Sequence, residues 1–130
     1  MTDHPPRILV VEDVPVMLEV LRMRLEAEGY AVVTARDGVE ALEKAREHHP
    51  DLVLLDLMLP RLSGERVCRE LRSDPRTRAV PIIVVSARVG ETERLRALAA
   101  GADAFLAKPY DVAQLTGEIR TRLAAKRAIA

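Results

Sequence analysis

The sequence predicts an α/β fold in which helices cover both faces of a parallel sheet. Apolar runs of strand length recur five times along the chain, and stretches with the apolar spacing of helices lie between them. Three of the five runs are apolar almost throughout, as strands covered on both faces should be. Because 130 residues suffice for one domain with a substantial hydrophobic core, we expect a single domain over residues 1–130.

The order of these segments predicts the individual elements. The expected strands are Arg7–Glu12, Ala31–Ala35, Leu52–Asp56, Pro81–Ser86 and Ala104–Ala107. Apolar residues at helical spacing predict one helix with the face Val14, Leu18, Leu21 and Leu25, and another with the face Val112, Leu115, Ile119 and Leu123. Three more helices are expected around Val39–His48, Gly64–Ser73 and Glu91–Ala100. Glycines and prolines lie between the expected strands and helices, where the chain must turn.

The composition argues against several classes of protein. The formal net charge is zero, so overall charge does not draw the chain to nucleic acid or to an anionic membrane. No apolar run approaches membrane-spanning length and the N-terminus lacks a secretion signal, so we expect a cytoplasmic protein. With Cys68 as the single cysteine, an intramolecular disulfide is impossible. The segment after the last helix is too short for an output domain, and we expect none.

Polar residues follow the ends of four expected strands. Glu12 and Asp13 follow the first apolar run, Asp56 ends the third, Ser86 ends the fourth and Lys108 follows the fifth. Ligands of an open parallel sheet bind beyond the carboxyl ends of its strands. These residues should therefore share one pocket, in which three carboxylates beside one ammonium would suit a divalent cation and a phosphoryl group.

The carboxylates also have ordinary structural explanations. An aspartate after a strand, such as Asp56, is most often a turn former or a helix cap. Glu12 or Asp13 could cap the helix that follows, but only one of them is needed for that. The second acid leaves like charges to be neutralised, for which Mg²⁺ with oxygen ligands is a natural solution. A carboxylate beside a metal can also attack phosphorus, as aspartate nucleophiles do.

The other two residues are ambiguous when taken singly. Lys108 before Pro109 is usually an exposed loop lysine, and the proline permits a cis peptide bond. Its alternative role is a point charge on a phosphoryl oxygen. Ser86 can merely end a strand, or its hydroxyl can bond a phosphoryl oxygen. The arrival of all these groups at one sheet edge favours the functional interpretation.

With these motifs the chain resembles the receiver domains of response regulators in two-component signalling, from Arg7 to about Lys126. The matching segments are Val11-Glu12-Asp13, Leu55-Asp56-Leu57-Met58-Leu59-Pro60 with Gly64, Val85-Ser86-Ala87-Arg88, and Gly101-Ala102-Asp103-Ala104-Phe105 leading into Lys108-Pro109-Tyr110. The resemblance implies a flavodoxin-like sheet with strand order 2-1-3-4-5. A member of this family is a known example of that order.

The resemblance also implies the role of each site residue. Asp56 would be the phosphoacceptor. Mg²⁺ would be bound by Asp13, Asp56 and the backbone carbonyl of Met58, with Glu12 acting through water. The phosphoryl oxygens would be bound by Ser86, Lys108 and the backbone N–H of Ala87. Ser86 and Phe105 would switch the surface made by the fourth helix, fifth strand and fifth helix, although burial alone would explain Phe105.

The family resemblance implies partners as well. The phosphoryl group would come from a sensor histidine kinase or a histidine phosphotransfer protein, and the signal would pass to a downstream protein target. The chain would be a monomer, or a dimer promoted by phosphorylation. Ala104 and Glu118 replace charged residues that winged-helix members usually carry, which argues against their particular dimer interface.

Other functions fit the sequence less well. The chain would be a phosphoryl acceptor, not a turnover enzyme, and Met58 and Arg88 offer no group to activate water, so a long-lived phosphoryl state is expected. A haloacid-dehalogenase-like phosphatase would need a general acid at Met58. A flavodoxin-like electron carrier would need a phosphate loop and more aromatic residues. A docking module that works without phosphorylation remains an alternative.

An arginine-rich segment gives no support for nucleic-acid binding. Residues 61–78 carry six arginines against three acids, namely Arg61, Arg66, Arg69, Arg72, Arg76 and Arg78 against Glu65, Glu70 and Asp74. Binding of nucleic acid would call for aromatic platforms or a recognition helix, and neither is visible. We interpret the segment as a solvated helix face and expect no direct binding of nucleic acid.

Overall fold

Five strands and five helices alternate along the chain in the computed structural model, which describes residues 4–87 and 90–129. The strands are β1 (Arg7–Val11), β2 (Ala31–Ala35), β3 (Leu52–Asp56), β4 (Ile82–Ser86) and β5 (Ala104–Ala107). The helices are α1 (Pro15–Ala27), α2 (Gly38–His48), α3 (Gly64–Ser73), α4 (Glu91–Ala100) and α5 (Val112–Ile129). Each predicted element is present, and Glu12 and Pro81 lie just outside the strands to which the sequence assigned them.

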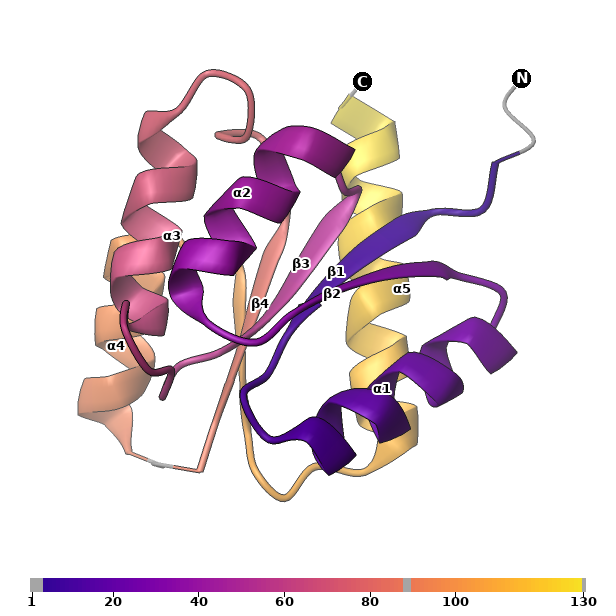
Figure 1. Cartoon of the computed structure of the whole chain (residues 1–130), viewed down its shortest axis with the longest axis horizontal. Coiled ribbons are helices and arrows are strands. Elements are labelled where there is room, and N and C mark those ends of the chain that lie inside the picture. Colours follow the sequence, from indigo (N-terminus) through magenta and orange to yellow (C-terminus); the bar gives the residue numbers. More distant parts are fainter. Residues whose placement is uncertain (1–3, 88–89, 130) are drawn as a thin grey trace.

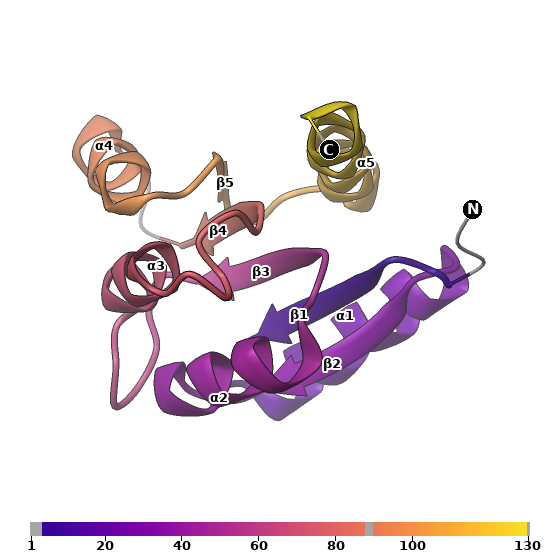
Figure 2. The ribbon, with the colours of Figure 1, turned by 90° about the horizontal axis from the view of Figure 1, so that it is seen from above.

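The strands form one parallel sheet in the order β2-β1-β3-β4-β5, as the family resemblance implied. Helices α1 and α5 cover one face, and α2, α3 and α4 cover the other (Figures 1 and 2). One core cluster lies on each side of the sheet, and each cluster combines alternate strand residues with the buried faces of its helices. This doubly wound arrangement brings the carboxyl ends of all five strands to one edge.

The two predicted helix faces need one correction each at their first residue. Val14 is 47% exposed and Val112 is 37% exposed, whereas the later members of both faces are buried. Val14 is the residue before α1, where the backbone is still extended, and Val112 lies in the first turn of α5. A residue at the start of a helix projects beyond the sheet, so helical spacing alone did not place it in the core.

The arginine-rich segment is only partly the solvated face that the sequence suggested. Arg61, Arg66 and Arg76 are well exposed, but the Arg72 side chain is only 25% exposed. Arg72 donates hydrogen bonds to backbone carbonyls of two other segments and to Asp103. Among the described residues, no helix is long and apolar enough to cross a membrane.

Candidate functional site

The predicted site residues meet at the carboxyl edge of the sheet. Asp56 is the last residue of β3, and Glu12 follows β1, the strand that pairs with β3. Both are buried, with 6% and 2% of their surface exposed. Ser86 ends β4 and is fully buried, and Lys108 follows β5. Parallel strands in register thus carry side chains from distant parts of the chain into one pocket.

Lys108 joins two of the carboxylates. Its Nζ lies 2.7 Å from Oδ2 of Asp56 and 3.1 Å from Oε1 of Glu12. The backbone of Lys108 is fixed by a 2.8 Å hydrogen bond from its N–H to the carbonyl of Ser86. The Lys108–Pro109 peptide bond is cis, which the sequence had allowed. Lys108 is therefore a site residue and not a free loop lysine.

Three carboxylates form the acidic part of the pocket. Glu12, Asp13 and Asp56 each offer an oxygen atom, and these atoms lie within 4.8 Å of one another. Asp13 is exposed, and its side chain forms no hydrogen bond or ion pair with the described part of the chain. Carboxylate oxygens, one of them open to solvent, are the ligands that Mg²⁺ and Ca²⁺ prefer. The donor set therefore fits a hard divalent cation.

The structural explanations weighed for the acids prove partly right. Oδ1 of Asp56 accepts a 2.9 Å hydrogen bond from the N–H of Met58, so Asp56 does form a turn. It does not cap the next helix, because Ser63 caps α3. Oε2 of Glu12 accepts a 3.1 Å hydrogen bond from the N–H of Val14, the residue before α1. In the described part of the chain no side chain caps α1 itself, so the capping role considered for Glu12 and Asp13 is wrong.

Burial and charge shift the pKa values of two site residues. Burial is the main cause that raises the pKa of Glu12 above its ordinary value, and the Asp56 charge adds to it. Burial alone would lower the pKa of Lys108. Its hydrogen bonds to Asp56 and Glu12 outweigh that effect and raise the pKa of Lys108, so it remains an ammonium.

Gly64 holds the loop after Asp56 against α3. A Cβ at this position would lie 2.6 Å from the Asp56 carbonyl oxygen and 2.7 Å from Cα of Leu57, both of them backbone atoms. The N–H of Gly64 also donates a 3.0 Å hydrogen bond to the Leu57 carbonyl. The sequence indicated Gly64 only as part of a motif, because a close backbone approach across six residues of loop has no periodic signal.

The structure also describes three other residues that the sequence analysis named, namely Phe105, Ala87 and Met58. Phe105 is half-buried on β5 and packs against the core cluster beneath α2, α3 and α4. Ala87 is exposed directly after β4. The side chain of Met58 is half exposed. Arg88, on which part of the expected phosphoryl lifetime rests, lies outside the described residues.

Sequence reasoning assigned no role to Tyr110, yet it belongs to the surroundings of the site. Tyr110 is half-buried and packs against the core cluster beneath α1 and α5. Burial raises the pKa of its phenol above the ordinary value, and the charges of Lys108, Glu12 and Asp56 all act on it. Only its place after Lys108-Pro109 marked it in the sequence. Tyr110 is therefore close enough to the site for the charges of the site residues to act on its phenol.

A doubly wound parallel sheet with an acidic pocket and a lysine at the strand ends is the arrangement that the resemblance to receiver domains implied. The family model of the response regulator receiver domain matches residues 8–120. The chain belongs to this family.

Relatives and solved structures agree with this assignment. The chain is 45% identical over 118 residues to the phosphate regulon transcriptional regulatory protein PhoB of Rhizobium meliloti, a match that covers 91% of the chain and 52% of PhoB. It is 43% identical to the response regulator PleD of Caulobacter vibrioides, over 88% of the chain and 25% of PleD. The chain thus spans about half or less of the length of these relatives.

Two solved structures place the fold in the same family. A CheY-like receiver domain from Methanospirillum hungatei has a TM-score of 0.90 at 28% identity, with 97% of this chain and 99% of that chain covered. The receiver domain of a sensor histidine kinase from Pseudomonas aeruginosa has a TM-score of 0.86 at 35% identity, with 92% and 98% covered. In that second structure a magnesium ion is coordinated in the active-site cleft.

Proposed function

We propose that Asp56 accepts a phosphoryl group from a sensor histidine kinase or a histidine phosphotransfer protein. The observation that carries this proposal is the buried Asp56 carboxylate between the ammonium of Lys108, at 2.7 Å, and two further carboxylates. A carboxylate oxygen would attack phosphorus, and the bond between phosphorus and the donor imidazole would break. The imidazole keeps the bonding electron pair, and Asp56 becomes an acyl phosphate.

A magnesium ion belongs to this proposal. Asp13, Asp56 and the Met58 carbonyl would bind it, with Glu12 acting through water. When bound, the ion would neutralise the charge that gathers on the phosphoryl oxygens. The fit of three clustered carboxylates, with Asp13 open to solvent, supports it.

Lys108, Ser86 and the Ala87 backbone N–H would bind the phosphoryl oxygens. The raised pKa of Lys108 keeps its charge at neutral pH, and a point charge suits a phosphoryl oxygen. Ser86 would move toward the phosphoryl group and Phe105 would turn inward. Because a bound group shifts populations only through contacts that differ between two states, the surface of α4, β5 and α5 would carry the response.

The domain would act as a substrate with weak chemistry of its own, not as a turnover enzyme. Met58 stands two residues after Asp56 and has no group that could orient an attacking water. The absence of such a group favours a long-lived phosphoryl state. The protein would carry out this reaction in the cytoplasm. A phosphatase would need an acid at this position, which makes it the weaker candidate.

Helix α1 offers a surface for the phosphoryl donor. It begins three residues after Glu12, and four of its apolar residues are between 41% and 71% exposed, namely Val16, Met17, Val20 and Met23. An exposed apolar stripe beside a reactive site marks a place for a protein partner. A helical donor protein would bury this stripe while its phosphohistidine faces Asp56. The target that reads the phosphorylated form would be a different protein.

The test is the intact mass of the protein after incubation with acetyl phosphate and Mg²⁺. A single phosphoryl adduct is expected for the native chain, and none for Asp56→Asn or for a sample treated with EDTA. Asp103→Asn, at the opposite edge of the sheet, serves as the matched control and should still form the adduct. A folded native chain that forms no adduct would favour the docking-module alternative.

A further inference from the structure

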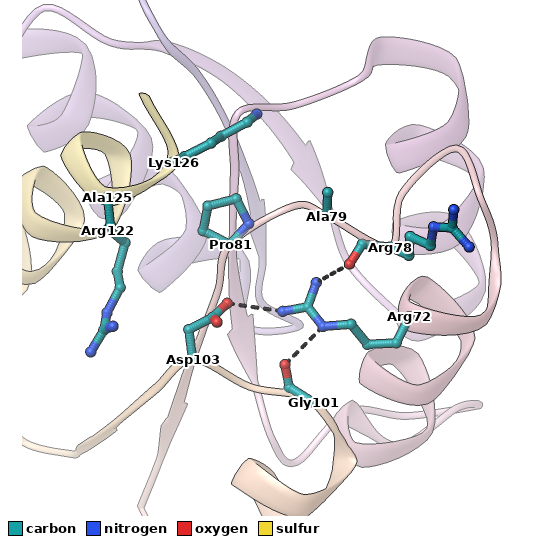
Figure 3. A pocket seen from close by; sticks show the side chains of 9 residues that line it. All are labelled: Arg72, Arg78, Ala79, Pro81, Gly101, Asp103, Arg122, Ala125 and Lys126. Carbon is teal, nitrogen blue, oxygen red and sulfur yellow. Dashed lines mark hydrogen bonds and ion pairs between the residues drawn. The ribbon is translucent and has the colours of Figure 1, made fainter. Parts of the chain in front are cut away.

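A cavity of about 510 Å³ lies at the edge of the sheet opposite to Asp56 (Figure 3). Nine residues line it, and four of them are basic, namely Arg72, Arg78, Arg122 and Lys126. Most of this charge is already paired. Arg122 is 2.9 Å from Glu118, Lys126 is 3.5 Å from Asp51, and Arg78 points away from the cavity. Arg72 differs from the other three basic residues because its guanidinium makes four hydrogen bonds to other parts of the chain.

Arg72 connects α3 to two loops, the one before β4 and the one between α4 and β5. Its Nε lies 2.9 Å from the carbonyl of Gly101, directly after α4. Its Nη1 donates to the carbonyls of Arg78 and Val80, at 2.9 and 2.5 Å, in the loop before β4. Its Nη2 lies 2.9 Å from Oδ2 of Asp103, just before β5. Only the fork of a guanidinium can reach four acceptors in different directions, so a lysine could not replace it.

The acceptors of Arg72 are themselves fixed. Oδ2 of Asp103 also accepts a 2.8 Å hydrogen bond from the N–H of Ile82, and the N–H of Asp103 donates to the Ile82 carbonyl at 2.8 Å. Gly101 has a φ of 119°, and a Cβ there would come within 2.6 Å of Cγ of Arg72. The C-terminal end of α4 is thus bound to α3 and, through Asp103, to the start of β4.

The two halves of α4 are held differently. Its buried residues, Ala97 and Ala100, are in the C-terminal half. In the N-terminal half Leu95 is 53% exposed, and no side chain caps the helix at Gly90. Among the described residues, an ion pair joins the middle of α4 to α3, between Arg96 and Glu65 at 3.7 Å, and because the Arg96 side chain is 69% exposed this pair contributes little.

We propose that Arg72 is a positioning residue that fixes the C-terminal end of α4 and confines the response of α4 to its N-terminal half. The inference rests on the proposed phosphorylation of Asp56, because that is the event to which α4 would respond. The N-terminal half follows β4 at the end where Ser86 lies, whereas the Arg72 contacts lie at the far edge. A helix held at one end turns about that end, and Arg72 sets the pivot.

Amide hydrogen exchange of the full chain, measured by mass spectrometry with and without acetyl phosphate and Mg²⁺, tests this pivot. In the native protein the phosphorylation-dependent change should appear at residues 91–96 and not at 97–101. In Arg72→Lys, exchange at 97–101 should be about tenfold faster before phosphorylation, the effect of losing one charge-assisted hydrogen bond. After phosphorylation the change should extend into 97–101.

Two further variants make the result specific. Arg69→Lys is the matched control, because Arg69 is exposed on the same helix, and it should behave as the native protein. Asp103→Asn weakens one of the four contacts and should give a smaller effect at the same residues. An unchanged exchange rate at 97–101 in unphosphorylated Arg72→Lys would overturn the anchor. So would a uniform rise over the whole chain with the phosphorylation-dependent change still confined to 91–96.

The same samples separate this inference from the function on which it rests. Their intact mass reports phosphorylation directly, so a missing adduct contradicts the proposed function. Whether or not the protein is phosphorylated, the exchange rates at residues 97–101 in unphosphorylated Arg72→Lys and Arg69→Lys show whether Arg72 fixes the C-terminal end of α4. A native protein whose phosphorylation-dependent change covers 97–101 would contradict the pivot.

Discussion

The ammonium of Lys108 lies 2.7 Å from Oδ2 of Asp56, although 52 positions separate the two residues. Lys108 follows β5, and β4 stands between that strand and β3, the strand that Asp56 ends. Strands two apart in a sheet are about 10 Å from each other, so only a long side chain can make this contact. The pair therefore joins the end of the central strand β3 to the end of β5, the outermost strand, which is flanked by α4 and α5 in the chain.

Removal of Lys108 should strengthen the binding of Mg²⁺. In Lys108→Ala the carboxylates of Glu12, Asp13 and Asp56 lose the ammonium that now lies between two of them. The loss of a competing cation at this distance should raise Mg²⁺ affinity by roughly tenfold. Isothermal titration calorimetry with MgCl₂ measures it, with Lys44→Ala on α2 as control. Unchanged or weaker binding would show that Lys108 does not oppose the cation.

The pKa of Glu12 predicts a pH dependence of stability. Burial raises this pKa above its ordinary value of 4.5, so the folded state binds the proton more tightly than the unfolded chain does. The free energy of unfolding of the metal-free protein should then fall as pH rises from about 4.5 through the raised pKa. Glu12→Gln lacks this titration and should unfold at a higher temperature than the native chain at pH 7.

Thermal unfolding in EDTA between pH 4 and pH 7 measures this effect. The gap between Glu12→Gln and the native protein should close as pH falls. Glu47→Gln, whose side chain is 69% exposed, is the control and should show no such gap. A gap that does not depend on pH would argue against a buried, destabilised Glu12 carboxylate.

Gly64 should not tolerate a methyl group. In Gly64→Ala the new Cβ meets backbone atoms of Asp56 and Leu57 at 2.6 and 2.7 Å, and backbone cannot move aside cheaply. Such overpacking should reduce the free energy of unfolding by about 1–3 kcal/mol in a urea titration. Gly117→Ala is the control of opposite sign. Its Cβ meets nothing closer than 3.9 Å within α5, so alanine should stabilise the helix by roughly 0.5–1 kcal/mol. Equal stability of Gly64→Ala and the native chain would refute the close approach.

The elements and the site edge were predictable because their signals are local. Apolar runs marked β1 to β5, and the polar residues at their ends predicted which side chains meet. The exposure of residues at the start of a helix was not predictable in this way, because Val14 and Val112 follow the helical period but project past the sheet. Arg72 escaped as well, since its partners lie at Arg78, Val80, Gly101 and Asp103, and no spacing rule joins these positions. Contacts set by tertiary packing leave no period in the sequence.

Chemical trapping of the phosphorylated residue tests the central claim most directly. After incubation with acetyl phosphate and Mg²⁺, sodium borohydride should reduce the acyl phosphate to an alcohol and convert Asp56 to homoserine. Peptide mass mapping should find homoserine at position 56 alone, and not when EDTA is present. Homoserine at Asp13 or elsewhere, or none in a folded protein that carries a phosphoryl adduct, would contradict the assignment of Asp56 as the phosphoacceptor.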